Sequence, residues 1–232
     1  MTIPVAQEPT RHAERSRLEH GLAEAEQLAL DELDLIRGWL TRAVEAASTS
    51  QTETADDVKT WAGEAERRYG ELHDRLLAVI ATQAPVAGDL RLAMALLHVN
   101  DRIERMSAQC VNIATLWQVM PDGASPSEEQ LRCLSAMADL ACEQIEAARE
   151  SFHERDLVAA RALRDHDLGI NEHNRRCFAL AVSDGDDAGR REAGFIVAMM
   201  ARAIERIGDN AVDIGQQLEF VVTSRMRGLA VG

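Results

Sequence analysis

Apolar residues recur every three or four positions through most of this chain, with polar residues between them. That period matches the roughly 3.6 residues of an α-helical turn, so it predicts amphipathic helices that each turn one face towards a core. Short stretches rich in Pro, Gly, Ser, Thr or Asp separate the periodic segments. The predicted helices cover residues 11–47, 55–83, 86–119, 127–154, 156–182 and 188–226. The pattern therefore predicts an all-α protein.

The breaks between the helices differ in strength. Residues 1–10 contain two prolines and no periodicity, which predicts a frayed tail. Residues 120–126 hold two prolines and a glycine, and they are the strongest linker signal in the chain. Ser127 stands three positions before Gln130, an arrangement that predicts a capping box at the start of the fourth helix.

The third and sixth predicted helices contain similar stretches. Residues 100–114 and 200–215 align at a constant offset, with Glu104 matching Glu205 and Val111 matching Val212. Self-similarity at such a distance is typical of a duplicated structural unit. We therefore predict two tandem three-helix bundles, at residues 1–120 and 121–232, related by a pseudo-twofold axis.

Three acidic residues, Glu205, Asp209 and Asp213, recur every four positions in the second of these stretches. Residues four apart share a helix face, so their carboxylates repel one another unless a cation, an arginine or a proton intervenes. Three interpretations stay open: a bound metal ion, ion pairs with Arg202 and Arg206, or a solvated face. A ladder this tight favours the metal ion, since exposed ion pairs contribute only about 0–1 kcal/mol.

Composition limits the function. The net charge of −14 disfavours nucleic acid and anionic lipid as direct ligands. The four cysteines form no CxxC pair and lie in apolar helical surroundings, where small buried hydrophobic side chains in a reducing compartment are expected. No apolar run approaches the roughly 20 residues that span a bilayer, and the N-terminus lacks a signal-peptide core. We expect a cytoplasmic protein.

Motifs for enzymatic chemistry are missing from the sequence. It has no G-x-S-x-G, no P-loop and no dinucleotide fingerprint. Di-iron bundles need two Glu-x-x-His pairs, and only Glu150 with His153 fits that spacing. We therefore expect a protein that is not an enzyme; the alternative is a metal-binding helical bundle with storage or hydrolytic activity.

Three motifs together resemble one family. Residues 205–214, and more weakly residues 104–106, are similar to the ExxxD signature of PhoU phosphate-signalling proteins. Residues 83–91, which read Gln-Ala-Pro-Val-Ala-Gly-Asp-Leu-Arg, resemble the Q-x-P-x-A-x-D-L-R corner of the same family. The motifs occur in the family's order, and the resemblance covers nearly the whole chain. It implies six helices in two three-helix bundles.

The resemblance also implies a function. PhoU proteins are cytosolic negative regulators of phosphate uptake and of the phosphate-starvation response. They act in signal transduction as adaptors that link the ATPase of a phosphate ABC transporter to a sensor histidine kinase. The implied state is a homodimer that reaches the membrane only through its partners and binds no nucleic acid.

Some PhoU proteins hold metal clusters on the inner acids of their bundles, with Mg, Mn, Zn or Fe as candidate ions. By resemblance, the second-repeat ligands are Asp167, Asn171, Glu205, Asp209 and Asp213. In the first repeat, Ala62 and Ala108 stand where the family has carboxylates. The residues left for a weak or lost site there are Glu66, Asp101, Glu104 and Asn112.

The corner motif has a structural interpretation. Pro85 disfavours helical geometry at the preceding residue and suits the first turn of a helix. Asp89 is expected to cap that helix and Arg91 to pair with Asp89. A contribution to partner docking is the alternative for Pro85, Asp89 and Arg91.

Overall fold

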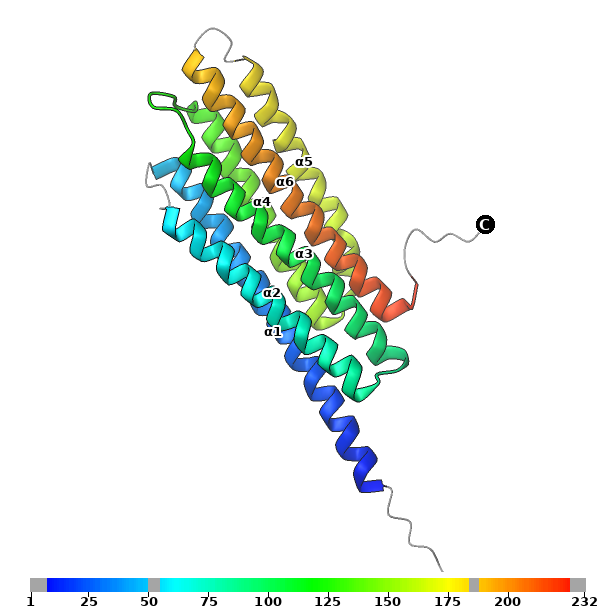
Figure 1. Ribbon diagram of the computed structural model, residues 1–232. Helices are drawn as coiled ribbons and strands as arrows, with labels where there is room; N and C mark the ends of the chain where they lie inside the picture. The colour runs from blue at the N-terminus through cyan, green and yellow to red at the C-terminus, as the bar shows by residue number, and fades with distance from the viewer. Residues whose placement is uncertain (1–7, 50–54, 184–187, 226–232) are drawn as a thin grey trace, which may run out of the picture.

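The computed structural model describes residues 8–49, 55–183 and 188–225, and within these ranges it contains six α-helices and no strand (Figure 1). None of these helices has the continuous apolar length that a bilayer crossing requires. The helices are α1 (Glu8–Thr49), α2 (Ala55–Gln83), α3 (Ala87–Gln118), α4 (Glu128–Glu154), α5 (Leu157–Ser183) and α6 (Ala188–Thr223). The all-α prediction is confirmed.

Helices α1–α3 form one bundle and α4–α6 form the other, and the two bundles pack along their lengths (Figure 1). Helix α3 packs against α6 and α1 against α4, while α2 and α5 flank this central group. The corresponding helices of the two repeats are thus paired across the middle of the molecule. One hydrophobic core runs through both bundles; its largest fully buried side chains include Leu33, Leu72, Leu96, Met137, Ile145 and Phe152.

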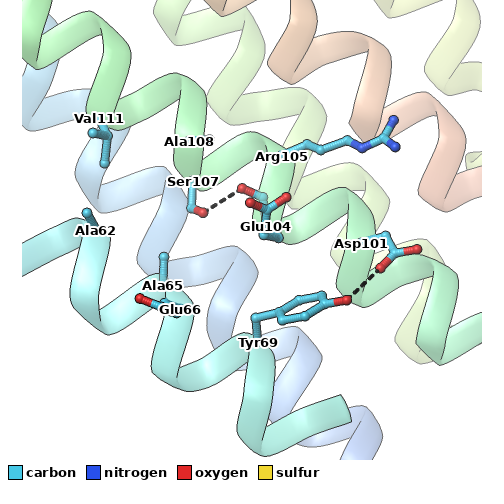
Figure 2. A pocket seen from close by; sticks show the side chains of 10 residues that line it. All are labelled: Ala62, Ala65, Glu66, Tyr69, Asp101, Glu104, Arg105, Ser107, Ala108 and Val111. Atoms are coloured by element: carbon cyan, nitrogen blue, oxygen red, sulfur yellow. Dashed lines mark hydrogen bonds between the residues drawn. The ribbon is translucent and has the colours of Figure 1, made fainter.

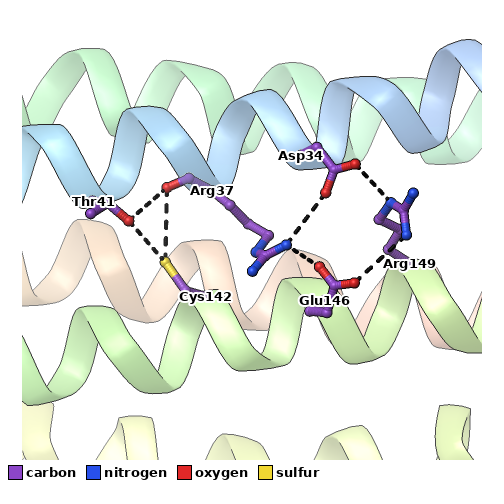
Figure 3. Close-up of polar contacts among 6 residues, drawn as sticks. All are labelled: Asp34, Arg37, Thr41, Cys142, Glu146 and Arg149. Carbon is purple, nitrogen blue, oxygen red and sulfur yellow. Dashed lines mark hydrogen bonds and ion pairs between the residues drawn. The ribbon is translucent and has the colours of Figure 1, made fainter.

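Charged side chains join the two repeats where α1 meets α4 (Figure 3). Arg37 of α1 pairs with Glu146 of α4, and Arg149 of α4 reaches back to Asp34 of α1, with 3.0 Å between Nε and Oδ2. Arg37 also contacts Asp34, and Arg149 contacts Glu146, so the four charges alternate around a closed ring. Such a network fixes the register of two helices more than it adds to stability.

Most helix boundaries follow the predicted ones. The capping box is present: Ser127 Oγ accepts from Gln130 N at 3.2 Å, and Gln130 Oε1 accepts from Ser127 N at 2.8 Å. The frayed tail at residues 1–10 is wrong for residues 8–10, which form the first turn of α1. Pro9 is no obstacle there, because backbone N–H groups in a first turn lack intrahelical acceptors. Residues 1–7, the breaks at 50–54 and 184–187, and the predicted helix end at 226 lie outside the described residues.

The corner between α2 and α3 is built from strained backbone. Ala84 and Ala87, on either side of Pro85 and Val86, have φ of 45° and 48°, a region that costs non-glycine residues about 1–2 kcal/mol. The predicted roles of Asp89 and Arg91 are wrong: no side chain caps α3. Asp89 Oδ2 instead accepts from Arg15 Nη1 of α1 at 2.6 Å, and Arg91 Nε donates to the carbonyl oxygen of Val221 on α6. Their tertiary partners tie the corner to both neighbouring helices.

Helix α6 carries a stripe of small residues at every seventh position: Gly194, Ala201, Gly208 and Gly215. Seven residues make nearly two helical turns, so the stripe stays on one side. A Cβ added to Gly215 would lie 2.9 Å from the carbonyl oxygen of Ala160 on α5, and one added to Gly194 would lie 3.1 Å from Ala181 Cα on the same helix. The stripe therefore lets the backbones of α5 and α6 approach closely, and that contact positions the candidate site.

Candidate functional site

Helices α5 and α6 bring together four of the five residues predicted to hold a metal ion. Asp167 and Asn171 lie one turn apart on α5, and Asn171 Nδ2 donates to Asp167 Oδ2 at 2.7 Å. The charges of Asp209 and Glu205, one turn apart on α6, interact with that of Asp167. This acid cluster, consisting of Asp167, Asn171, Glu205 and Asp209, is the candidate site.

Burial and mutual repulsion both act on these carboxylates. The pKa of Asp167 is raised, first by partial burial and second by the negative charge of Asp209. Burial also raises the pKa of Glu205, with Arg202 opposing the shift and Asp209 adding to it. For Asp209, partial burial raises the pKa, Arg202 opposes, and Asp213 adds to the rise. Each acid is thus poised to gain from a nearby cation.

Gly208 opens a space at the centre of the cluster. A Cβ at this position would lie 3.2 Å from Asp167 Oδ1 and 3.4 Å from Gln144 Oε1, and it would overlap Ile170. Both of those oxygens are buried, and in the geometry of the described residues neither accepts a hydrogen bond. The Gln144 side chain nevertheless lies close enough to Asp167 to lower the pKa of that carboxyl group. Gln144 is fully buried on α4, and its amide Nε2 donates to the carbonyl oxygens of Leu163 and Gly208. The Asp167 carboxylate and the Gln144 amide therefore meet beside the space that Gly208 leaves open.

Two of the residues predicted to bind a metal ion form ion pairs with arginines. Glu205 pairs with Arg202 one turn earlier on α6. Asp213 turns towards α3, where its Oδ2 lies 3.4 Å from Arg102 Nε, and its Oδ1 accepts from Gln216. Within the described ranges, no three His, Cys, Asp or Glu side chains are already arranged to hold a metal ion. A cation at the acid cluster would therefore have to draw Glu205 away from Arg202.

The corresponding part of the first repeat is an open groove between α2 and α3, with a volume of about 720 Å³ (Figure 2). Ala62 and Ala108 line it at the positions where the family resemblance implies carboxylates. Its remaining acids stand along the groove; Asp101 Oδ1 accepts from Tyr69 at 3.2 Å, and the Glu104 backbone carbonyl accepts from Ser107. Glu66 also lines the groove, whereas Asn112 is an exposed residue that does not.

A buried carboxylate lies next to this groove. Glu32 of α1 is only 4% exposed and lines a small cavity that shares Ala65, Tyr69, Glu104 and Ser107 with the groove. No described residue forms a hydrogen bond or ion pair with Glu32. Burial raises its pKa from 4.5 to about 7, against the opposing charge of Arg68. Glu32 therefore titrates near neutral pH.

The sequence analysis did not single out Glu32 and Gln144. Their burial could have been predicted, because each is a polar residue at a position of the apolar stripe of its helix. Glu32 continues the spacing of Ala25, Ala29 and Ile36, and Gln144 that of Met137, Ala141 and Ala148. A polar side chain on such a stripe must be satisfied internally or by a ligand.

The acid cluster has the oxygen donors that a cation site uses. Carboxylate and amide oxygens from α4, α5 and α6 are the donors that hard divalent cations prefer. The buried oxygens of Asp167 and Gln144 and the space at Gly208 fit such an ion.

Comparison with known proteins agrees with the duplicated architecture. The model of the PhoU domain matches residues 30–116 and again residues 134–218. A phosphate-specific transport system accessory protein PhoU homolog 1 from Mycobacterium tuberculosis is 30% identical over 154 residues, which are 66% of this chain and 69% of that protein. The PhoU homolog from Synechocystis is 24% identical over 212 residues, covering 91% of this chain and 94% of the relative.

Solved structures share the fold. The crystal structure of the phosphate transport system regulatory protein PhoU from Streptococcus pneumoniae superimposes with a TM-score of 0.81. It is 18% identical, and the match covers 90% of this chain and 98% of that one. At this identity the likeness establishes the six-helix fold, while the family is established by the two matched PhoU domains and the mycobacterial relative.

Proposed function

Because this chain belongs to the PhoU family, we propose that it is a negative regulator of phosphate uptake and of the phosphate-starvation response. It acts in the cytoplasm, without enzymatic activity, as an adaptor between the ATPase of a phosphate ABC transporter and a sensor histidine kinase. The observation that carries this proposal is the match of both halves of the chain to the PhoU domain. The relatives are named accessory proteins of phosphate-specific transport systems, which supports the transport role.

The surface of the molecule supports an adaptor. The equivalent faces of the two repeats differ, since one is an open groove with Ala62 and Ala108 in its lining and the other is the acid cluster. Two unlike faces on one rigid body suit two unlike partners. Helices α5 and α6 also expose large apolar side chains, which supports homodimer formation; these are Leu168, Phe178, Val182, Phe195 and Met199.

The adaptor role predicts stable complexes and a regulatory phenotype. Affinity-tagged protein, purified from its native cells grown in high phosphate, should carry with it the transporter ATPase or the sensor kinase. Deletion of the gene should leave phosphate-starvation genes expressed when phosphate is plentiful. Unchanged phosphate-dependent expression in the deletion strain would contradict the proposal. The control is a strain whose sensor kinase carries a catalytic-site mutation, because the starvation genes are not induced in it.

We further propose that the acid cluster binds a divalent or trivalent metal ion. Asp167, Asn171, Glu205 and Asp209 would hold it, with Asp213 close by on α6. The bound ion would supply positive charge between α5 and α6 and offset the repulsion among the three acids. The first-repeat residues Glu66, Asp101, Glu104 and Asn112 would bind metal weakly or not at all.

Asp209→Ala should lower the affinity for metal by at least about tenfold, because it removes a carboxylate ligand from the cluster. Elemental analysis of protein purified without chelator, followed by Mn²⁺ titration, measures this. Glu104→Ala is the matched control, since Glu104 is the first-repeat equivalent of Glu205, and its metal content should equal that of the wild type. Equal metal content in Asp209→Ala would show that the acids are structural.

A further inference from the structure

Two cysteine thiols face each other between α4 and α5. Cys177 Sγ lies 3.1 Å from Cys133 Sγ, and both are free thiols. Cys133 is 5% exposed and Cys177 is fully buried. A disulfide bond requires about 2.05 Å between the sulfurs, so only a small approach separates this pair from a cross-link.

The surroundings of the pair distinguish the two thiols. His173, one turn before Cys177 on α5, places its Nδ1 3.7 Å from Cys133 Sγ. The Cys133 thiol donates to the backbone carbonyl of His173 at 3.4 Å, and the Cys177 thiol donates to Cys133. Arg176 lies close enough for its positive charge to act on Cys177. An imidazole and a guanidinium near a thiol are features of oxidisable cysteine sites.

We propose that Cys133 and Cys177 form a redox site that a peroxide converts to an intramolecular disulfide. The Cys133 thiol gives up its proton to water, and the Cys133 thiolate attacks one peroxide oxygen. The O–O bond breaks, Cys133 becomes a sulfenic acid, and the leaving hydroxide takes up the released proton as water. Cys177 Sγ then attacks Cys133 Sγ, and the departing hydroxide leaves with the Cys177 proton as a second water.

The order of events follows from the geometry. Cys133 is the more exposed sulfur and the one beside the imidazole, so it meets the oxidant first. Cys177 is fully buried, and burial together with Cys133 raises its pKa, which keeps it protonated until the sulfenic acid forms 3.1 Å away. The other two cysteines lack this arrangement: Cys110 and Cys142 donate to the carbonyl oxygens of Ile36 and Arg37.

The disulfide would fix α5 from both ends. The short connection around Asp156 already joins α4 to α5 at one end, and Cys177 lies roughly 30 Å further along α5. Asp167 and Asn171 stand between these two points. Oxidation would therefore restrict the motion of the helix segment that carries half of the acid cluster. This role is independent of the proposed adaptor function.

The test starts from fully reduced wild-type protein and measured doses of hydrogen peroxide. Intact mass under denaturing conditions should fall by the mass of two hydrogen atoms, peptide mapping should join Cys133 to Cys177, and thiol reductant should reverse both. The oxidised protein should melt at a higher temperature. If Cys142 is oxidised as fast as the pair, or if the cross-link joins separate molecules, the proposal is overturned.

Variants separate the roles of the side chains. Cys177→Ser should leave a sulfenic acid on Cys133 that dimedone traps, whereas Cys142→Ser, the control, should cross-link as the wild type does. The absence of a dimedone adduct on folded Cys177→Ser would contradict the mechanism. Circular dichroism establishes that each variant is folded.

Discussion

Glu32→Gln should stabilise the protein at pH 8 by about 2.5 kcal/mol more than it does at pH 5. Glu32 is 4% exposed and has no hydrogen-bond or ion-pair partner among the described residues. Burial raises its pKa from 4.5 to about 7, so its ionised form is penalised only in the folded state. That difference in pKa corresponds to about 3 kcal/mol of folding free energy.

The direction of the effect follows from the raised pKa. Below pH 4.5 the Glu32 carboxyl group is neutral in both the folded and the unfolded chain, so it carries no penalty. As the pH rises through 7, the unfolded chain is already ionised and the folded chain must ionise in a buried site, which lowers its stability. Glutamine stays neutral throughout, so the two proteins should diverge between pH 4.5 and 7.

Urea unfolding of both proteins at pH 5, 6, 7 and 8 measures this divergence. Glu66→Gln is the matched control, because Glu66 lies exposed on the adjoining groove. This substitution removes one negative charge from the surface and none from a buried position. Parallel stability curves for wild type and Glu32→Gln would contradict the prediction. A divergence of the same size in Glu66→Gln would assign the effect to net charge.

The sequence was sufficient for the helices because their signals are local. The capping box at Ser127 and the break at Pro85 act within a few residues, and the structure places helix ends within about three residues of the predicted positions. The pairing of α1 with α4 and of α3 with α6 could not be predicted. The apolar face of an amphipathic helix gives no indication of which neighbouring helix it meets.

The candidate site was predictable in composition and only partly in geometry. Glu205, Asp209 and Asp213 follow a four-residue spacing, but four residues rotate a helix about 40° past a full turn. Asp213 therefore points about 80° away from Glu205, towards Arg102 of α3. The pairing of Asp89 with Arg91 failed for a related reason, since proximity in sequence predicts no tertiary partner, and Arg15 and Val221 are closer in the fold.

The glycine stripe on α6 gives the second large expected effect: Gly215→Ala should destabilise the protein by about 3 kcal/mol. The added Cβ would lie 2.7 Å from Leu163 Cδ1 and 2.9 Å from the carbonyl oxygen of Ala160. Leu163 is fully buried, and the carbonyl belongs to the backbone of α5, so neither can give way without a shift of the helix. Overpacking of this kind typically costs about 1–3 kcal/mol, and a backbone clash falls at the upper end.

Gly63→Ala is the matched control, because Gly63 lies in the interior of α2, is exposed, and would place its Cβ in open space. Alanine is the better helix former there and should stabilise the protein by about 0.5–1 kcal/mol. The same urea denaturation measures both variants. The two changes in stability have opposite signs because α5 approaches α6 closely at Gly215 and no helix lies that close to Gly63. A stabilising effect of Gly215→Ala would mean that α5 and α6 lie further apart than the structure places them.

Because α5 and α6 carry the acid cluster, Gly215→Ala should also lower the affinity of the cluster for a metal ion, whereas Gly63→Ala should leave that affinity unchanged.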